Sequence, residues 1–317
     1  MKLKDARIIF MGTSFFAKEL LKNLIENNTK IELVITQPDK PAGRKKELKP
    51  SEVKILAQKN NLKLEQFTKL DAKALEKIKL IKPDLVIVAA YGMIIPSEML
   101  TQPQYGFINI HTSLLPELRG SSPIQTSLRQ GLKETGITIM KMDSGIDSGE
   151  IISQAPVTID PQDTYPILEK KLTTTTNQVL IKTLDEYLEK KIIPQSQNSD
   201  QATYTRIIKK QDGKIDWSET SEKIYNQFRA FYNWPQVHTF WNRNGKHQKL
   251  TLTEIAQTDQ IAKNKQIGEV YQKDDRVLVK TDQGSIILKK VQLEGKNNLT
   301  IKDFLNGNPT LIGNILK

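Results

Sequence analysis

The sequence contains no cysteine and only three histidines, His111, His238 and His247. The absence of cysteine excludes disulfides, thiolate metal sites and a cysteine nucleophile, so any catalysis must rely on carboxylates, amides or one of these histidines. No apolar run approaches the roughly 18 residues needed to cross a bilayer, and no secretory signal precedes the first apolar segment. We therefore expect a globular, cytoplasmic protein, and 317 residues are enough for about two domains.

Acidic residues are outnumbered, because 36 Asp and Glu stand against 47 Lys and Arg and give a net charge of +11. The excess is uneven: residues 206–317 contain 19 basic and 12 acidic side chains. Such a field favours a polyanionic partner, most commonly nucleic acid, although a lysine-rich composition from an AT-rich genome would also produce it. The charge points to a nucleic-acid surface in the C-terminal third without deciding it.

The first half of the chain alternates short apolar runs with helical patterns. The runs cover residues 7–11, 31–35 and 84–89, and helical patterns extend from 14 to 27 and onward from 51. This alternation predicts βαβ units and an α/β fold with a Rossmann-like, mostly parallel sheet. The segment after the first run lacks the G-x-G-x-x-G spacing of a dinucleotide site, so we reject a nicotinamide cofactor and expect Thr13 or Ser14 to cap the following helix.

A polar segment without periodicity divides the chain. It occupies residues 191–207 and is predicted to be a linker between a first domain at 1–190 and a second at 208–317. Beyond it, one helical pattern at 218–232 is followed by several short strand-like runs separated by polar turns. The second domain is therefore predicted to be a small β-barrel or sandwich.

The chemistry is concentrated between residues 106 and 152. Asn109 and His111 are two residues apart on a predicted strand, so their side chains point to the same side, at the carboxyl end where ligands of such sheets bind. A glycine-containing loop after the next strand carries Asp143 and Asp147, which could reach His111. A lone histidine is more often structural and an Asp-Ser-Gly segment is usually a turn, but together these groups suffice for acyl-type transfer without a covalent intermediate.

These residues resemble the folate-dependent formyltransferases. The resemblance rests on Asn109-Ile110-His111, Ser113-Leu114-Leu115-Pro116, Arg119-Gly120 and residues 143–149. Residues 37–44, 91–96, 215–217 and 229–235 are similar to the members of the superfamily that act on methionyl-tRNA, and the similarity extends over nearly the whole chain.

The resemblance implies transfer of the formyl group of 10-formyltetrahydrofolate to the free amine of methionine on initiator methionyl-tRNA, by direct attack and without a metal. It implies that Asn109, His111 and Asp147 are catalytic and that Ser113, Leu114, Leu115 and Pro116 line the folate site. It further implies that residues 1–190 form the catalytic domain and that 208–317 form an oligonucleotide-binding-like barrel that binds tRNA. The tRNA-binding residues expected on this basis are Arg44, Lys45, Lys46, Arg206, Lys209 and Lys210.

Two alternatives remain open: an amino-sugar-nucleotide N-formyltransferase, and a catalytically inactive RNA-binding homologue. The basic segment at 40–49 argues against the sugar, and the joint presence of Asn109, His111 and Asp147 argues against inactivity. The chain departs from the family pattern at Thr112, at Glu117-Leu118 and at Ile207. We expect a monomer.

Overall fold

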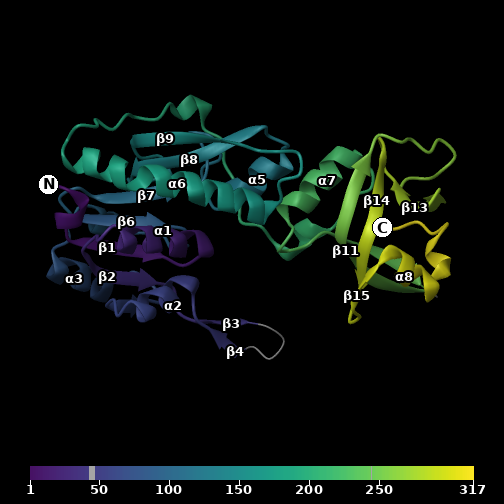
Figure 1. The fold of residues 1–317 in the computed structure, drawn as a ribbon, viewed down its shortest axis with the longest axis horizontal. Helices are drawn as coiled ribbons and strands as arrows, with labels where there is room; N and C mark the ends of the chain where they lie inside the picture. The colour runs from purple at the N-terminus through teal and green to yellow at the C-terminus, as the bar shows by residue number, and fades with distance from the viewer. Residues whose placement is uncertain (43–46, 244) are drawn as a thin grey trace. The chain divides into compact units, whose positions relative to one another are not determined.

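The computed structural model describes residues 1–42, 47–243 and 245–317 (Figure 1). The chain divides into two compact units. The first comprises Met1–Pro123, Glu134–Thr158 and Glu169–Arg206, and the second comprises Ile124–Lys133, Ile159–Leu168 and Ile207–Lys317. Two short segments that lie within residues 1–190, Ile124–Lys133 and Ile159–Leu168, therefore pack with the second unit, which a division read along the sequence does not anticipate.

The first unit is built on a mixed sheet of strand order β5-β2-β1-β6-β7-β8-β9. The strands that run parallel are β1 (Ile8–Gly12), β2 (Ile31–Thr36), β5 (Leu64–Gln66), β6 (Leu85–Ala89) and β7 (Phe107–His111). Two antiparallel strands complete it, β8 (Glu134–Lys141) and β9 (Ile151–Thr158). Every residue of β1 and β6 is buried, as continuous apolar runs require when both faces of a strand are covered. The predicted Rossmann-like, mostly parallel sheet is confirmed.

Helical elements precede, connect and follow these strands along the chain. They are η1 (Leu3–Asp5), α1 (Phe15–Glu26), α2 (Glu52–Lys59), α3 (Ala72–Ile81), α4 (Ser97–Leu100), α5 (Pro123–Arg129) and α6 (Tyr165–Leu188). The Ser14 hydroxyl accepts a hydrogen bond from the backbone N–H of Ala17 at 3.3 Å, which confirms the predicted cap of α1. α1 and α6 lie side by side (Figure 1), and Asn23 Nδ2 donates to the backbone oxygen of Asn177 at 3.4 Å.

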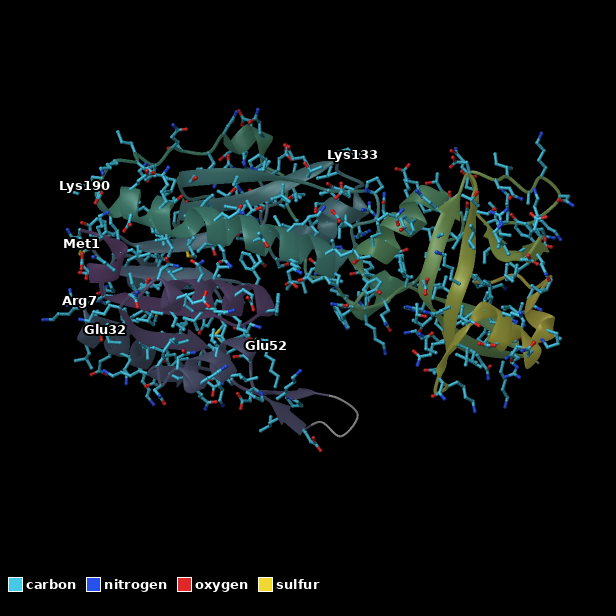
Figure 2. The ribbon with its side chains drawn as sticks, viewed as in Figure 1. Met1, Arg7, Glu32, Glu52, Lys133 and Lys190 are labelled. Carbon is cyan, nitrogen blue, oxygen red and sulfur yellow. The ribbon has the colours of Figure 1, made fainter. Side chains whose placement is uncertain are left out.

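The amino ends of the central strands are held by a salt bridge, away from the carboxyl ends where ligands bind. Arg7, labelled in Figure 2, donates from Nη2 to Asp84 Oδ1 at 2.9 Å and from its backbone N–H to Asp84 Oδ2 at 2.8 Å. The hydrogen bond from Arg7 holds the pKa of Asp84 below its ordinary value. Arg7 directly precedes β1 and Asp84 directly precedes β6, so the salt bridge fixes the register of these two strands.

The second unit contains an antiparallel sheet curved as a half-barrel, of order β10-β11-β14-β13-β12, with β15 paired to β14. Its strands are β10 (His238–Arg243), β11 (Lys246–Thr258), β12 (Val270–Lys273), β13 (Arg276–Lys280), β14 (Ser285–Leu293) and β15 (Asn298–Thr300). Its helical elements are η3 (Lys210–Gly213), α7 (Ser221–Ala230), α8 (Ile301–Asn306) and η4 (Pro309–Leu311). Trp241 is buried and packs edge-on against Phe304, with ring centroids 6.1 Å apart. The predicted helix and short strands are therefore found.

Two further segments bear on function. β3 (Lys40–Ala42) and β4 (Glu47–Lys49) form a small antiparallel ribbon within the basic stretch. The predicted linker includes η2 (Ser199–Gln201), and its residues 195–206, which we call the strap, pair with the first unit. Gln195 exchanges backbone hydrogen bonds with Ile151 at 2.8 Å in each direction, and Tyr204 bridges to Arg119. The strap is thus an ordered part of the first unit.

In the described ranges no helix is both long and apolar enough to span a membrane.

Candidate active site

The predicted catalytic residues meet at the carboxyl end of β7. Asn109 and His111 alternate with buried Ile110 on this strand, so both side chains point into one cleft of about 370 Å³. Asp147 lines the same cleft from the loop between β8 and β9. The structure therefore brings together the three residues that the family resemblance implies are catalytic.

His111 is held in one orientation by a backbone carbonyl. Its side chain is 6% exposed, and Nε2 lies 3.0 Å from the oxygen of Leu118. A carbonyl oxygen only accepts, so Nε2 carries a proton and Nδ1 faces Asp147 Oδ2 at 3.6 Å. Nδ1 is therefore the ring nitrogen that can exchange a proton with the carboxylate, after a small approach or through a water.

Asp147 is held from several sides. Asn109 Nδ2 donates to Oδ1 at 3.3 Å, and the backbone N–H of Gly120 donates to Oδ2 at 2.7 Å. Asp147 has φ +48°, a left-handed conformation that is uncommon for residues other than glycine, although Asp adopts it more readily than most. Asp143 behaves differently: it is exposed and accepts from Ser148 Oγ and the backbone N–H of Gly145, closing its own turn. Only Asp147 of the two loop carboxylates takes part in the site.

Two of the predicted folate-binding residues, Ser113 and Leu115, are held through their backbones close to His111 in the chain. The Thr138 hydroxyl donates to the backbone oxygen of Ser113 at 2.7 Å and accepts from the backbone N–H of Leu115 at 3.0 Å. Gln154 Nε2 donates to the oxygen of Leu115 at 2.8 Å. In the described chain, the lining of the 370 Å³ cleft includes Thr112 but not Ser113, Leu114, Leu115 or Pro116.

The departures from the family pattern fall at positions that act through the backbone. Leu118 has φ +57° and supplies the carbonyl oxygen that accepts from His111, while the carbonyl of Glu117 accepts from Ser113 Oγ at 2.6 Å. Neither interaction depends on the identity of the side chain at 117 or 118. The geometry around His111 is therefore compatible with both departures.

The opposite wall of the cleft comes from the segment after β6. Tyr91 lines the cleft, is 2% exposed, and has a hydroxyl without a hydrogen-bond partner in the described part of the chain. Burial raises the pKa of Tyr91 to about 12, so its hydroxyl stays protonated. Gln37 Nε2 donates to the backbone oxygen of Tyr91 at 2.7 Å, which joins the motif at 37–44 to the one at 91–96. The sequence pointed to both motifs but not to their contact.

The predicted tRNA-binding residues are spread over several places. Arg44, Lys45 and Lys46 lie outside the described residues. Lys209 and Lys210 are exposed in the second unit, and the backbone oxygen of Arg206 accepts from Ser122 Oγ at 2.6 Å in the first. On either side of the basic segment at 40–49, Lys54 pairs with Asp39 at 2.8 Å, so Lys54 supports the loop rather than a solvent-facing cationic surface.

A basic cluster in the second unit escaped prediction as a cluster, although Lys210 itself was predicted to bind tRNA. We call it the Phe240 cluster; its members are Lys210, Lys214, His238, Phe240 and Lys249. Phe240 on β10 pairs with Lys249 on β11, and Lys214 Nζ lies 5.9 Å from the centroid of the Phe240 ring. Burial first, and then the charge of Lys210, lowers the pKa of Lys249. The cluster was missed because its lysines come from separate elements that the fold brings together.

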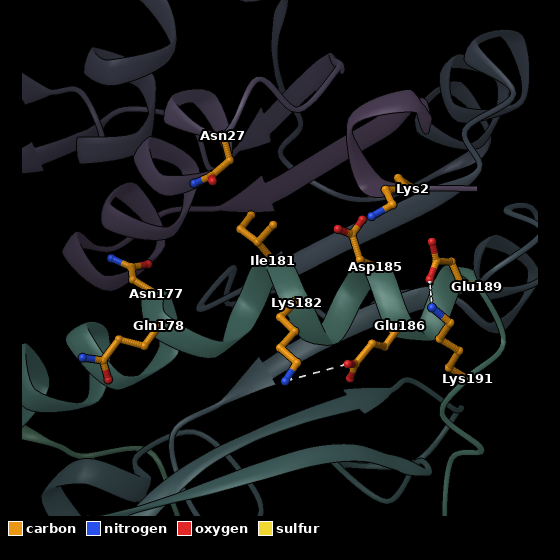
Figure 3. Close-up of a pocket in the computed structure, with 10 residues that line it drawn as sticks. All are labelled: Lys2, Asn27, Asn177, Gln178, Ile181, Lys182, Asp185, Glu186, Glu189 and Lys191. Atoms are coloured by element: carbon orange, nitrogen blue, oxygen red, sulfur yellow. Dashed lines mark ion pairs between the residues drawn. The ribbon is translucent and has the colours of Figure 1, made fainter.

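A second cleft, of about 490 Å³, runs along α6 (Figure 3). It has fewer side chains available for catalysis or ligand binding. Its charged side chains already pair with one another, as Lys182 does with Glu186 at 3.9 Å and Lys191 with Glu189 at 2.6 Å. Asp185, on the same helix, accepts from the backbone N–H of Leu3. No group of three or more His, Asp or Glu side chains in the described ranges is arranged to hold a metal ion. The convergence of Asn109, His111 and Asp147 makes the smaller cleft the candidate active site.

Comparison with known families matches both parts of the chain. Residues 6–184 match the formyl transferase family, and residues 207–309 match the formyl transferase C-terminal domain. A methionyl-tRNA formyltransferase of Caldicellulosiruptor saccharolyticus is 43% identical over 313 residues, covering 98% of this chain and 99% of the relative. The methionyl-tRNA formyltransferase of Bacillus subtilis is 37% identical and covers 98% and 97%.

Solved structures share the fold at low sequence identity. WlaRD, a sugar 3N-formyl transferase crystallised in the presence of dTDP and 5-N-formyl-THF, superposes with a TM-score of 0.65 at 21% identity, covering 92% of this chain and 99% of that one. HypX from Aquifex aeolicus, in complex with tetrahydrofolic acid, gives a TM-score of 0.65 at 15% identity, covering 95% and 47%. Both support the arrangement of a Rossmann-like sheet followed by a smaller domain.

Proposed function

Because the chain belongs to the formyl transferase family, we propose that it transfers the formyl group of 10-formyltetrahydrofolate to the amine of methionine on initiator methionyl-tRNA. The observation that carries the proposal is the convergence of Asn109, His111 and Asp147 in one cleft of a chain that matches methionyl-tRNA formyltransferases over nearly its whole length. Full-length relatives of this kind favour a methionyl-tRNA acceptor over an amino-sugar nucleotide. The intact catalytic set argues against an inactive homologue.

The geometry supports direct attack of the amine on the formyl carbon. As the new C–N bond forms, Asn109 Nδ2 donates to the formyl oxygen, and His111 Nδ1 donates to it through the proton that it exchanges with Asp147; both stabilise the negative charge on that oxygen. Asp147, beside His111, takes the proton that leaves the amine, directly or through water. Breaking the bond from the formyl carbon to N10 releases tetrahydrofolate, whose N10 gains a proton. No covalent enzyme intermediate is needed.

The folate is assigned to the cleft beside Tyr91. The cleft is walled by Tyr91, Met93 and Ile95, which suit a flat heteroaromatic ring, and the catalytic residues stand at its other side. WlaRD and HypX, which share the fold, were crystallised with formylated or unformylated tetrahydrofolate. Ser113, Leu114, Leu115 and Pro116 stay predicted folate-binding residues.

The tRNA is assigned to the predicted basic residues and to the Phe240 cluster. Lys210, Lys214 and Lys249 form no ion pair in the described part of the chain, and they surround a partly exposed aromatic ring. Phosphates would relieve the mutual repulsion of these lysines, and a base could stack on Phe240. Arg44, Lys45, Lys46, Arg206 and Lys209 stay predictions, as do the monomeric state and the cytoplasmic location.

Label transfer by the purified full-length protein tests the proposal. Formyl-labelled 10-formyltetrahydrofolate is supplied with initiator methionyl-tRNA, with uncharged initiator tRNA, or with a nucleotide-linked amino sugar. We expect label on methionyl-tRNA alone, because only that acceptor combines a free amine with a polyanion. Transfer to the sugar but not to methionyl-tRNA would identify the alternative enzyme.

A further inference from the structure

The strap covers both loops that carry the catalytic geometry. Thr203 accepts from the backbone N–H of Leu118 through its hydroxyl at 2.8 Å and from that of Arg119 through its carbonyl at 2.9 Å. Gly120 has φ +109°, and a Cβ there would lie 2.8 Å from the backbone oxygen of Thr205, so the strap approaches closely only because this residue is glycine. The carbonyl that orients His111 and the N–H that binds Asp147 are both on this covered loop.

Gln197 of the strap connects that loop to the loop of Asp147. Its Nε2 donates to the backbone oxygens of Asp147 at 2.8 Å and Gly149 at 2.7 Å. Its Oε1 accepts from Arg119 Nε at 3.1 Å and Nη2 at 2.8 Å. Both amide protons and both oxygen lone pairs are used, so the orientation of the amide is determined by its partners.

Arg119 is an unusual partner because it is 3% exposed and forms no ion pair in the described chain. Its remaining contact is Nη1 donating to the hydroxyl of Tyr204 at 3.3 Å, with the Tyr204 ring also nearby. A buried guanidinium would be served better by a carboxylate than by an amide. A carboxylate at 197, however, would have no proton to donate to the carbonyls of Asp147 and Gly149.

We infer that Gln197 is a positioning residue, which holds the backbone of Asp147 so that its carboxylate stays directed at His111, with Arg119 fixing Gln197 in turn. The inference rests on the proposed function. Asn109 and Gly120 hold the carboxylate, while Gln197 holds the carbonyl of the same residue, whose left-handed φ must be maintained. Without Gln197 the backbone can relax and the carboxylate can move from Nδ1, and displacements near 1 Å cost about 100-fold in rate.

Gln197→Glu separates positioning from folding. The variant keeps or strengthens the contact with Arg119 but replaces both donated hydrogen bonds by repulsion between oxygens. We expect kcat to fall about 10- to 100-fold at saturating folate and methionyl-tRNA, with both KM values within about twofold and the melting temperature unchanged or higher. Gln197→Ala should lower kcat similarly and also lower the melting temperature, because Arg119 loses its acceptor. Gln195→Ala, at an exposed strap position held only through its backbone, is the matched control and should match the wild type.

A double variant distinguishes action through Asp147 from a general structural effect. In an Asp147→Ala background, Gln197→Glu should cause no further loss of kcat, whereas a merely structural residue would lower it again. Wild-type kcat in Gln197→Glu, or losses that multiply in the double variant, would overturn the inference while leaving the proposed function intact. Failure of the wild type to formylate methionyl-tRNA would instead overturn the proposed function itself.

Discussion

The two units treat charge in opposite ways. At the site of the first unit, Asp147 is bound by Asn109 and Gly120, and the ring of His111 is fixed by a carbonyl. In the second unit, lysines of the Phe240 cluster gather beside a buried histidine, His238, and form no ion pairs within the described residues. Groups that must react are immobilised within the protein, whereas groups that bind a polyanion leave their charge to be neutralised by the ligand. Substitutions in the two units should therefore change different kinetic parameters.

The largest effect is expected in the first unit. Asn109→Ala, His111→Ala and Asp147→Ala should each reduce kcat by about 100-fold or more, since each removes an oxyanion donor or an acid/base group. Their combined effects should be less than multiplicative because they act as a unit. Steady-state kinetics with saturating tRNA and folate measure this, and folding is checked by thermal unfolding.

Asp143→Asn is the matched control for these three, because Asp143 lies in the same loop but only closes its own turn. Its kcat should stay close to that of the wild type. Near-normal turnover in any of the three alanine variants would remove that residue from the mechanism, and a large loss in Asp143→Asn would show that the site includes the second carboxylate.

The next largest effect concerns the basic segment at 40–49, and it is expected from the sequence. If Arg44 recognises the acceptor end, Arg44→Lys should cost roughly 1 to 3 kcal/mol on the initiator, as for a lost bidentate contact, and reduce discrimination against elongator methionyl-tRNA. Lys45→Ala and Lys46→Ala should weaken both tRNAs alike. The measurement is kcat/KM for both tRNAs at one ionic strength. If all three variants discriminate between initiator and elongator methionyl-tRNA equally well, the segment at 40–49 only attracts tRNA electrostatically and does not select it.

A smaller effect is expected in the second unit. Lys214→Ala and Lys249→Ala should raise KM for methionyl-tRNA several-fold, leave kcat unchanged, and each reduce the slope of log K against log[salt] by about 0.7 to 0.9. Lys223→Ala is the control, because Lys223, on α7, already pairs at 2.8 Å with Glu219, which precedes the helix. A fall in kcat without a change in salt slope would contradict the separation between the two units.

The sequence predicted much of the first unit and little of what supports its site. β1, β2 and β6 could be predicted because strands covered on both faces are continuously apolar, and Asn109 and His111 because their spacing places them on one side of β7. α6 could not, since Thr173–Thr176 is a poor helical sequence, and the hydroxyls of Thr173 and Thr176 bond back to the carbonyls of Glu169 and Leu172. The role of Gln197 is invisible in the sequence because its partners are 48 to 78 residues away.

The smallest expected effect is a dependence of tRNA binding on pH, and it arises from the Phe240 cluster. Burial, followed by the positive charge of Lys249, holds the pKa of His238 below its ordinary value of 6.5; the Gln236 carbonyl opposes this shift, and Lys210 and Lys214 add to it more weakly. Bound phosphates would neutralise the lysines and raise the pKa of His238 towards or above that value. The complex then binds more protons than the free protein, so affinity for tRNA must increase as the pH falls through the interval between the two pKa values.

The lowered pKa of His238 has the opposite consequence for folding: stability decreases as the pH falls, whereas affinity for tRNA increases. The two effects can therefore be measured separately. A histidine whose pKa is lowered in the folded state stabilises the fold above pH 6.5 and loses that contribution as the pH falls below it. Between pH 7.5 and 5.5 we therefore expect Kd for initiator tRNA to decrease by less than about tenfold per pH unit, while the melting temperature of the free protein declines. His238→Gln, confirmed as folded by its own melting curve, should flatten both trends. Should affinity weaken on acidification, or should His238→Gln keep the full dependence, the polyanion does not neutralise the Phe240 cluster and the tRNA surface of the second unit lies elsewhere.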